Sequence, residues 1–284
     1  MIKIENTQVV GWEPAIRGMR NPKNSWDRMD SYSNAGSCED CENHDVIRWN
    51  NCDESDICIG PNDHKLMMSL AKGGPVHAKY RRYIDVYVDI TAPLYWWKEF
   101  DTYRTAFAPN PFDIEENSCS TMHKLTDKEF TLDDFSNEHL LGGSNHYDER
   151  ETPYVDIGPA TDELAVLYSP SGVLEFIIIP MLNECRERYL IVDKEIKNLI
   201  EKGNVEISEL TRLKDLRKKY WWQLIQLLPS SYNQKRTVKL TYETCAAMYP
   251  DRKNHKQDEW RELCKWIESL PYSEIIIGAK ESED

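Results

Sequence analysis

The 284-residue sequence predicts an α+β fold in a single domain, residues 1–284, with a central antiparallel or mixed sheet and long helices. One clear strand covers Tyr83–Ile90, where apolar residues alternate with Tyr and Asp. Helical spacing over 184–202 and 208–228, on either side of a Gly-Asn break, predicts an antiparallel helical hairpin. Two further helices are expected at 237–249 and 258–270.

The N-terminal third contains few regular patterns. Residues 1–30 show no clear period and are expected to be irregular, and 31–62 form an insertion rich in Ser, Asn, Asp and Cys. A short helix is predicted at Asp63–Lys72, where Gly73-Gly74-Pro75 stops it. After the strand, Pro93 suits the first turn of a helix at about 94–105, whose aromatic residues cover more than one face.

The C-terminal half is more strongly patterned. Residues Leu174–Pro180 fit either a strand or the start of a helix, and Ser208 is a plausible N-cap for the second helix of the hairpin. Pro229 ends that helix, and residues 126–165 carry no pattern that assigns them.

The charge balance excludes some partners. Lys and Arg number 35 against 49 Asp and Glu, so the net charge is -14, and an acidic surface repels duplex nucleic acid. No segment has the roughly 18–20 apolar residues of a membrane span, and the N-terminus has no secretory apolar region. The sequence therefore predicts a cytoplasmic protein with no membrane partner.

Four of the eight cysteines lie together in the insertion. Cys38 and Cys41 form a Cys-x2-Cys half-site, and Cys52 and Cys58 follow with an unusual spacing of five intervening residues. Four thiolates suit a tetrahedral zinc, which would hold a loop that has no core of its own. The alternatives are a disordered loop with incidental thiols and a disulfide formed on purification.

Four polar segments are candidate anion sites. His77–Arg82 is rich in cations and suits phosphate or carboxylate, with a solvated basic face as an equal alternative. Asn117–Lys124 is a run of small hydrogen-bonding residues that suits a phosphate or a pyrimidine edge, although such runs are most often turns. Ser230–Thr237 and Arg252–His255 each precede an expected helix and suit either an anion or simple capping.

Taken in order, these segments resemble the flavin-dependent thymidylate synthases of the ThyX type, especially divergent phage-like relatives. The shared order is a His before a strand, an Ala-Pro-aromatic helix that ends in an Arg-His-Arg signature, a Ser-rich segment, and then Leu-Pro, an Arg and a His before a Trp-containing helix. In this sequence the pattern falls on His77, Ala92–Tyr95, Thr102–Arg104, Asn117–Lys124, Leu228-Pro229, Arg252, His255 and Trp260.

The resemblance covers about half of the chain and has departures. The signature keeps one Arg of two, and Glu99 stands where the family has a Gln. The family's Arg on the helix after Leu-Pro, which helps to activate the uracil, aligns near Glu243, and Arg236 substitutes for it only if the register slips.

The resemblance implies a ThyX-like fold and C5 methylation, or a related one-carbon modification, of a deoxyuridine monophosphate-type nucleotide. FAD, methylene-tetrahydrofolate and NADPH would take part, and the site would be shared among the subunits of a homotetramer. The implied catalytic residues are Arg236 and Arg252. The implied cofactor-binding residues are His77, Lys79, Tyr103, Arg104, Asn117 and His255, and the substrate-binding residues are Glu99, Ser118, Ser120, Lys124 and Arg236.

Two alternatives accompany this hypothesis. The degenerate signature and Glu243 favour a catalytically lapsed member of the fold that binds a nucleotide or a protein partner. The cysteine-rich insertion instead favours an unrelated interaction module organised by zinc.

Overall fold

The computed structural model describes residues 2–33, 57–103, 114–122, 124–142, 148, 151–155, 162–203 and 206–278. The chain forms two compact units. Unit 1 contains Ala92–Tyr95 and Cys119–Gln234, and unit 2 contains Ile2–Thr91, Trp96–Ser118 and Lys235–Asp284. The expected single domain stays a prediction, and each unit is described by itself.

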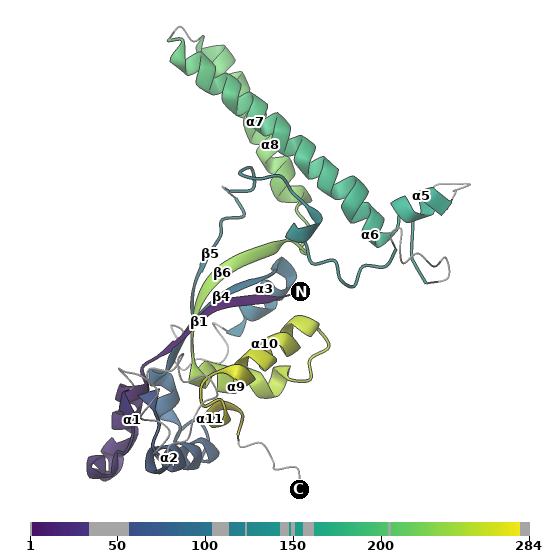
Figure 1. Cartoon of the computed structure of the whole chain (residues 1–284). Coiled ribbons are helices and arrows are strands. Elements are labelled where there is room, and N and C mark those ends of the chain that lie inside the picture. The colour runs from purple at the N-terminus through teal and green to yellow at the C-terminus, as the bar shows by residue number, and fades with distance from the viewer. Residues whose placement is uncertain are drawn as a thin grey trace, which may run out of the picture. The chain divides into compact units, whose positions relative to one another are not determined.

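A four-stranded sheet with the order β1-β4-β6-β5 organises unit 2 (Figure 1). Its strands are β1 (Lys3–Val10), β4 (Asp85–Pro93), β5 (Glu115–Ser118) and β6 (Asn233–Thr241). In unit 2, β4 extends to Thr91 and β6 begins at Lys235. The β1–β4 and β5–β6 pairs are antiparallel. Together with the long helices described below, this sheet confirms the α+β class.

Strand β4 has the predicted alternation. Val86, Val88 and Ile90 are buried, while Asp85 and Asp89 lie on the other face and pair with Lys residues of β6. The expectation that residues 1–30 are irregular is wrong. Strand β1 is bonded to β4, and helix α1 (Trp12–Arg20) follows it and buries Trp12, Ile16 and Met19.

The remaining helices of unit 2 carry its core. They are α2 (Pro61–Lys72), α3 (Leu94–Phe100, from Trp96 onward), α9 (Tyr242–Arg252), α10 (Asp258–Ser269) and α11 (Glu274–Ile277), with 3-10 turns at Asn21–Lys23, Trp26–Arg28 and Lys79–Tyr83. Trp96, Phe100 and Trp260 are fully buried and contact one another, with ring centroids 4.9–6.3 Å apart. Trp96 and Phe100 of α3 are therefore covered within unit 2 itself. The helix ends at Phe100 rather than near 105, and Pro93 ends β4.

The ends of the cysteine-rich insertion are held by a small antiparallel pair, β2 (Tyr32–Ser33) with β3 (Ile57–Cys58). Asp63, fully buried, accepts hydrogen bonds from Arg20, from the Ser31 hydroxyl and from the Asp30 and Ser31 amides. This network joins α2 to the segment before the insertion. Cys38, Cys41 and Cys52 lie outside the described residues.

Unit 1 contains the predicted helical hairpin, in which α7 (Ile179–Glu201) and α8 (Ile207–Leu227) lie side by side (Figure 1). Shorter helical segments precede it, at Asp162–Leu167, Pro170–Gly172, Val173–Ile178 and, earlier, Leu132–Asp134. Val173–Ile178 is thus helical rather than a strand. Helix α8 has Glu206 as its N-cap, so the expected capping by Ser208 is wrong.

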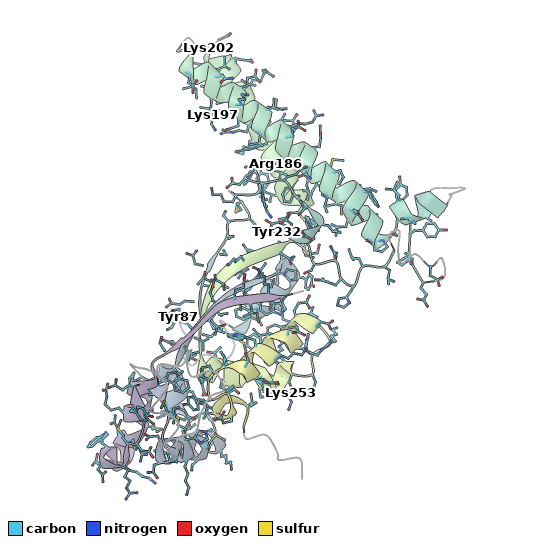
Figure 2. The ribbon with its side chains drawn as sticks, in the orientation of Figure 1. Tyr87, Arg186, Lys197, Lys202, Tyr232 and Lys253 are labelled. Carbon is cyan, nitrogen blue, oxygen red and sulfur yellow. The ribbon has the colours of Figure 1, made fainter. Side chains whose placement is uncertain are left out.

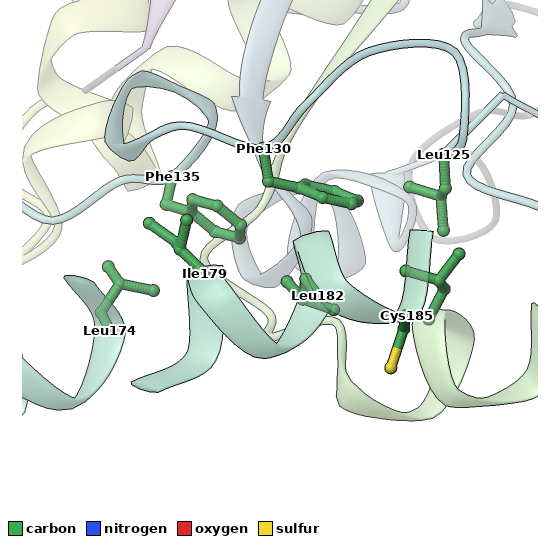
Figure 3. Close-up of a cluster of buried hydrophobic side chains, with 8 residues drawn as sticks. Leu125, Phe130, Phe135, Leu174, Ile179, Leu182 and Cys185 are labelled. Carbon is green, nitrogen blue, oxygen red and sulfur yellow. The ribbon is translucent and has the colours of Figure 1, made fainter. Parts of the chain in front are cut away.

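Two apolar clusters stabilise the hairpin. At its base, Phe130 and Phe135 from the preceding segment pack on Ile179 and Leu182 of α7 (Figure 3). Farther along, Val192 and Ile196 pack on Leu213 of α8. Among the described residues, no helix is both long and apolar enough to cross a membrane.

The prediction of a helix at 237–249 is wrong for the first half of that range. Residues 233–241 form β6, and α9 begins only at Tyr242, after Thr241 accepts the Thr244 amide as N-cap. The strand is visible in the sequence as alternation, because Val238 and Leu240 are buried whereas Lys235, Thr237 and Lys239 face the acids of β1 and β4.

Candidate functional site

Five side chains of unit 2 meet in what we call the Arg252 cluster. Its members are Glu99 of α3, Tyr103, Arg252 at the end of α9, His255 and Trp260 of α10. Arg252 Nη1 donates to Glu99 Oε1 at 2.5 Å, and its Nε donates to the Tyr103 hydroxyl at 2.5 Å. Segments about 150 residues apart in sequence are thereby joined through two hydrogen bonds from one guanidinium.

Trp260 is the fixed centre of the cluster. Its ring is fully buried, its Nε1 donates to Glu99 Oε2 at 3.0 Å, and the Arg252 guanidinium carbon lies 4.3 Å from its ring centroid. Both carboxylate oxygens of Glu99 are therefore engaged, and Arg252 gains a cation–π contact. The indole sets the position of the ion pair.

The pKa values in the cluster follow from these contacts. Burial would raise the pKa of Glu99, but the hydrogen bonds from Trp260 and Arg252 and the nearby positive charge bring it below its ordinary value. Burial raises the pKa of Tyr103, against the opposing effect of Arg252. At neutral pH the pair Glu99–Arg252 is thus fully ionised.

His255 completes the rim of the cluster. Its Nδ1 accepts the Gln257 amide at 3.2 Å, so the proton of the neutral ring lies on Nε2, 3.8 Å from Glu99 Oε1. The carbonyl of His255 is held by Arg261 at 2.7 Å. Lys253, at the end of α9 (Figure 2), and Lys256 are exposed beside it. The loop between α9 and α10 therefore carries two exposed positive charges within four residues of Arg252.

Arg236, a predicted catalytic and substrate-binding residue, lies in a second cluster. It stands on β6 rather than on a helix, and its Nη1 donates to both Asp101 Oδ1 and Glu116 Oε2 at 2.8 Å. Its guanidinium carbon is 4.2 Å from the centroid of Trp97. The side chain is 12% exposed and faces two carboxylates, so its charge is balanced from within unit 2.

The predicted Ser-rich segment divides between the units. Asn117 and Ser118 belong to β5, where Asn117 pairs with Thr237 and Ser118 pairs with Arg236. Ser120 and Lys124 belong to unit 1, and Lys124 pairs with Asp127 at 2.9 Å. The structure brings Asn117 and Ser118 beside Arg236, while a role for Ser120 and Lys124 in the same site stays a prediction.

The basic segment before β4 is also engaged within the fold. Arg81 is buried, lies 3.7 Å from Glu243 and donates to the Ile275 carbonyl. Glu243, near which the family's Arg is expected to align, is therefore the partner of a cation. His77 and Lys79 are exposed and lie outside the Arg252 cluster.

Other expected site residues are not placed. Arg104 lies outside the described residues, as do three of the four candidate zinc ligands. Cys58 is buried in β3. Within the described ranges, no three His, Cys, Asp or Glu side chains gather in a way that could hold a metal.

The sequence did not point to Asp101 and Glu116 as the carboxylates that neutralise Arg236. Asp101 and Glu116 flank the signature and the Ser-rich segment, and both are charged residues next to predicted site residues. The alternation over 233–241 was the signal that could have placed Arg236 on a strand next to them.

No protein-family profile matches this chain, and no curated protein is similar to it at the level of sequence. Among solved structures, thymidylate synthase X (ThyX) from Helicobacter pylori, crystallised with FAD and dUMP, aligns over 97% of this chain and 96% of its own length, with 13% identity and a TM-score of 0.46. The UMP/dUMP methylase PolB from Streptomyces cacaoi, bound with 5-Br dUMP, aligns over 95% and 88%, with 12% identity and a TM-score of 0.40.

Proposed function

We propose that this chain binds a pyrimidine nucleotide of the deoxyuridine monophosphate type together with FAD, and that the Arg252 cluster is part of the site. The supporting observation is the convergence of Glu99, Tyr103, Arg252 and His255. The resemblance singled out these four residues in two segments about 150 residues apart, and in unit 2 they lie within one set of hydrogen bonds and ion contacts.

The residues of the cluster fit an anionic group at its rim. Arg252 Nη2 has no hydrogen-bond partner among the described residues, and Lys253, His255 and Lys256 lie on the same loop. Trp260 and Tyr103 are buried, so they support Arg252 rather than offering a stacking face. A phosphate of the nucleotide or of FAD is the group that this donor set suits.

The finer proposal is C5 methylation of the nucleotide, with methylene-tetrahydrofolate as the carbon source and NADPH as the reductant. FAD, when bound, supplies hydride transfer. In that reaction Arg252 orients the anionic substrate, Glu99 fixes the guanidinium, and His255 holds a proton on Nε2 at the rim. A homotetramer in the cytoplasm and a zinc at Cys38, Cys41, Cys52 and Cys58 belong to the same proposal.

The second candidate function is the binding of a nucleotide without catalytic turnover. Arg236 is neutralised by Asp101 and Glu116, and the family's uracil-activating Arg aligns near Glu243, an acidic residue. Stabilisation of charge that develops on a pyrimidine ring needs a cation that is not already balanced. This observation favours nucleotide binding with little or no methylation.

Two measurements on the purified protein separate these functions. An absorbance spectrum of the purified protein, repeated after addition of FAD and removal of the unbound FAD, tests flavin binding, and thermal shifts with FAD and dUMP test the binding of both ligands. A tritium-release or product assay with dUMP, methylene-tetrahydrofolate and NADPH tests turnover. Binding with turnover supports the enzyme, binding without turnover supports the second candidate, and a protein that binds neither FAD nor dUMP contradicts both.

A further inference from the structure

Unit 2 also contains a cavity of about 350 Å³ at the opposite end of α9 from Arg252. Glu243 lies in the first turn of α9 and Arg252 in its last, so the two sites are about 13 Å apart along the helix axis at 1.5 Å per residue. The walls come from α2, the turn after it, η5 (Lys79–Tyr83), α9 and α11; helices α2, α9 and α11 are labelled in Figure 1. The lining includes three charged residues and three apolar residues that determine which ligand fits: Lys72, Arg81, Glu243, Ala246, Ala247 and Ile276.

The cavity holds a cation with unused hydrogen-bonding capacity. The Arg81 side chain is only 9% exposed, and its Nε is buried with no hydrogen-bond partner among the described residues. Its Nη1 is 3.7 Å from Glu243 Oε2, which is an ion pair without a short hydrogen bond. A buried donor without an acceptor is unfavourable, so a ligand oxygen that reaches this guanidinium gains a charge-assisted bond.

The charges and walls select the kind of ligand. Lys72 and Arg81 contribute two positive charges and Glu243 one negative charge, which leaves a net charge of +1 on the lining. The rest of the wall includes short apolar side chains from α9 and α11, Ala246, Ala247 and Ile276. A monoanion with a compact apolar body matches both features, and the volume lies within the range of small-molecule sites.

We propose that this cavity binds a small organic carboxylate. The carboxylate meets Arg81 inside and Lys72 at the rim, and the apolar body packs on Ala246 and Ala247. This site is separate from the Arg252 cluster and does not depend on the function proposed above.

Benzoate is the probe, and benzamide is its neutral counterpart of the same shape. Calorimetric titration of the full chain is expected to give saturable binding of one benzoate, with no binding of benzamide. Lys72→Met should weaken benzoate about fivefold, the effect of one exposed charge pair of about 1 kcal/mol. Lys65→Met, on the exposed face of the same helix and outside the lining, should leave the affinity unchanged.

A variant that fills the cavity tests the location, because Arg81 is buried and its replacement can prevent folding. Ala246→Leu should abolish benzoate binding while circular dichroism stays that of the wild type. Arg252→Met should retain benzoate affinity. The proposal would be overturned if benzoate and benzamide bind equally, if the two lysine variants have equal effects, or if Ala246→Leu keeps full affinity for benzoate. It would also be overturned if the protein binds inorganic phosphate but not benzoate.

Discussion

Glu99→Gln replaces a charged side chain by a neutral one of the same shape, and it tests the electrostatics of the Arg252 cluster. The carboxylate accepts from Arg252 at 2.5 Å and from Trp260 at 3.0 Å. A Gln that still accepts from Arg252 turns its amide nitrogen toward the buried Trp260 N–H and leaves that donor without an acceptor. We expect the free energy of unfolding to fall by about 1–3 kcal/mol because of the unsatisfied Trp260 donor. Loss of the ion pair should add at most about 1 kcal/mol, because the Glu99 side chain is one-third exposed.

Nucleotide affinity should move in the opposite direction from stability. Without the carboxylate, Arg252 keeps its full charge, and dUMP should bind about fivefold more tightly, which corresponds to about 1 kcal/mol. Urea unfolding gives the stability and equilibrium dialysis gives the affinity. A variant that is as stable as the wild type, or that binds dUMP more weakly, would refute this reasoning.

The effect on stability should depend on pH. The pKa of Glu99 is below its ordinary value of 4.5 in the folded chain, so the stability that its charge contributes is present above pH 4.5 and is lost as the pH falls through the folded value. The difference between wild type and Glu99→Gln should therefore shrink below pH 4.5. Glu262→Gln, which removes an exposed pair with Lys265, is the control and should change stability by less than about 0.5 kcal/mol.

Three further outcomes are expected. Arg236→Met should destabilise the chain by about 2 kcal/mol in urea unfolding, because Glu116, only 7% exposed, loses its cation; an unchanged midpoint would show that the pair is not formed. Burial raises the pKa of Glu274, but the His64 contact at 2.7 Å lowers that pKa below its ordinary value, so the charged Glu274 stabilises the fold and this stability is lost below pH 4.5. His64→Gln should therefore make stability fall less between pH 4.5 and lower pH. The same pH dependence of stability below pH 4.5 in His64→Gln and in the wild type contradicts this. Metal analysis should find one zinc per chain, which Cys41→Ser removes, and a stoichiometric absence of zinc in protein purified without chelators would end that hypothesis.

Elements with a strong period were predictable from the sequence. The alternation in β4 and the apolar spacing of α7, α8 and α10 match the structure because one face of each is buried. Strand β6 was not found, because Arg236 takes an inward position that usually carries an apolar residue. Its burial is compensated by Asp101, Glu116 and Trp97, which no local pattern reveals.

The candidate site was predictable in part for a similar reason. The resemblance selected Arg252, His255, Glu99 and Tyr103 as separate residues, and tertiary packing around Trp260 joins them. The pairing of Arg81 with Glu243 could not be predicted, because it depends on how η5 (Lys79–Tyr83) packs against α9, far away in the sequence.

The most direct test of the central claim is equilibrium dialysis of dUMP in the presence of FAD, with wild type, Arg252→Met and, as a surface control on α10, Lys265→Met. If the Arg252 cluster holds the phosphate of the nucleotide or of the cofactor, Arg252→Met should lower the affinity for dUMP or for FAD at least about tenfold, because one charge-assisted contact is lost. Lys265→Met should have the affinities of the wild type. Equal affinities in all three proteins, or no binding by the wild type, would contradict the claim.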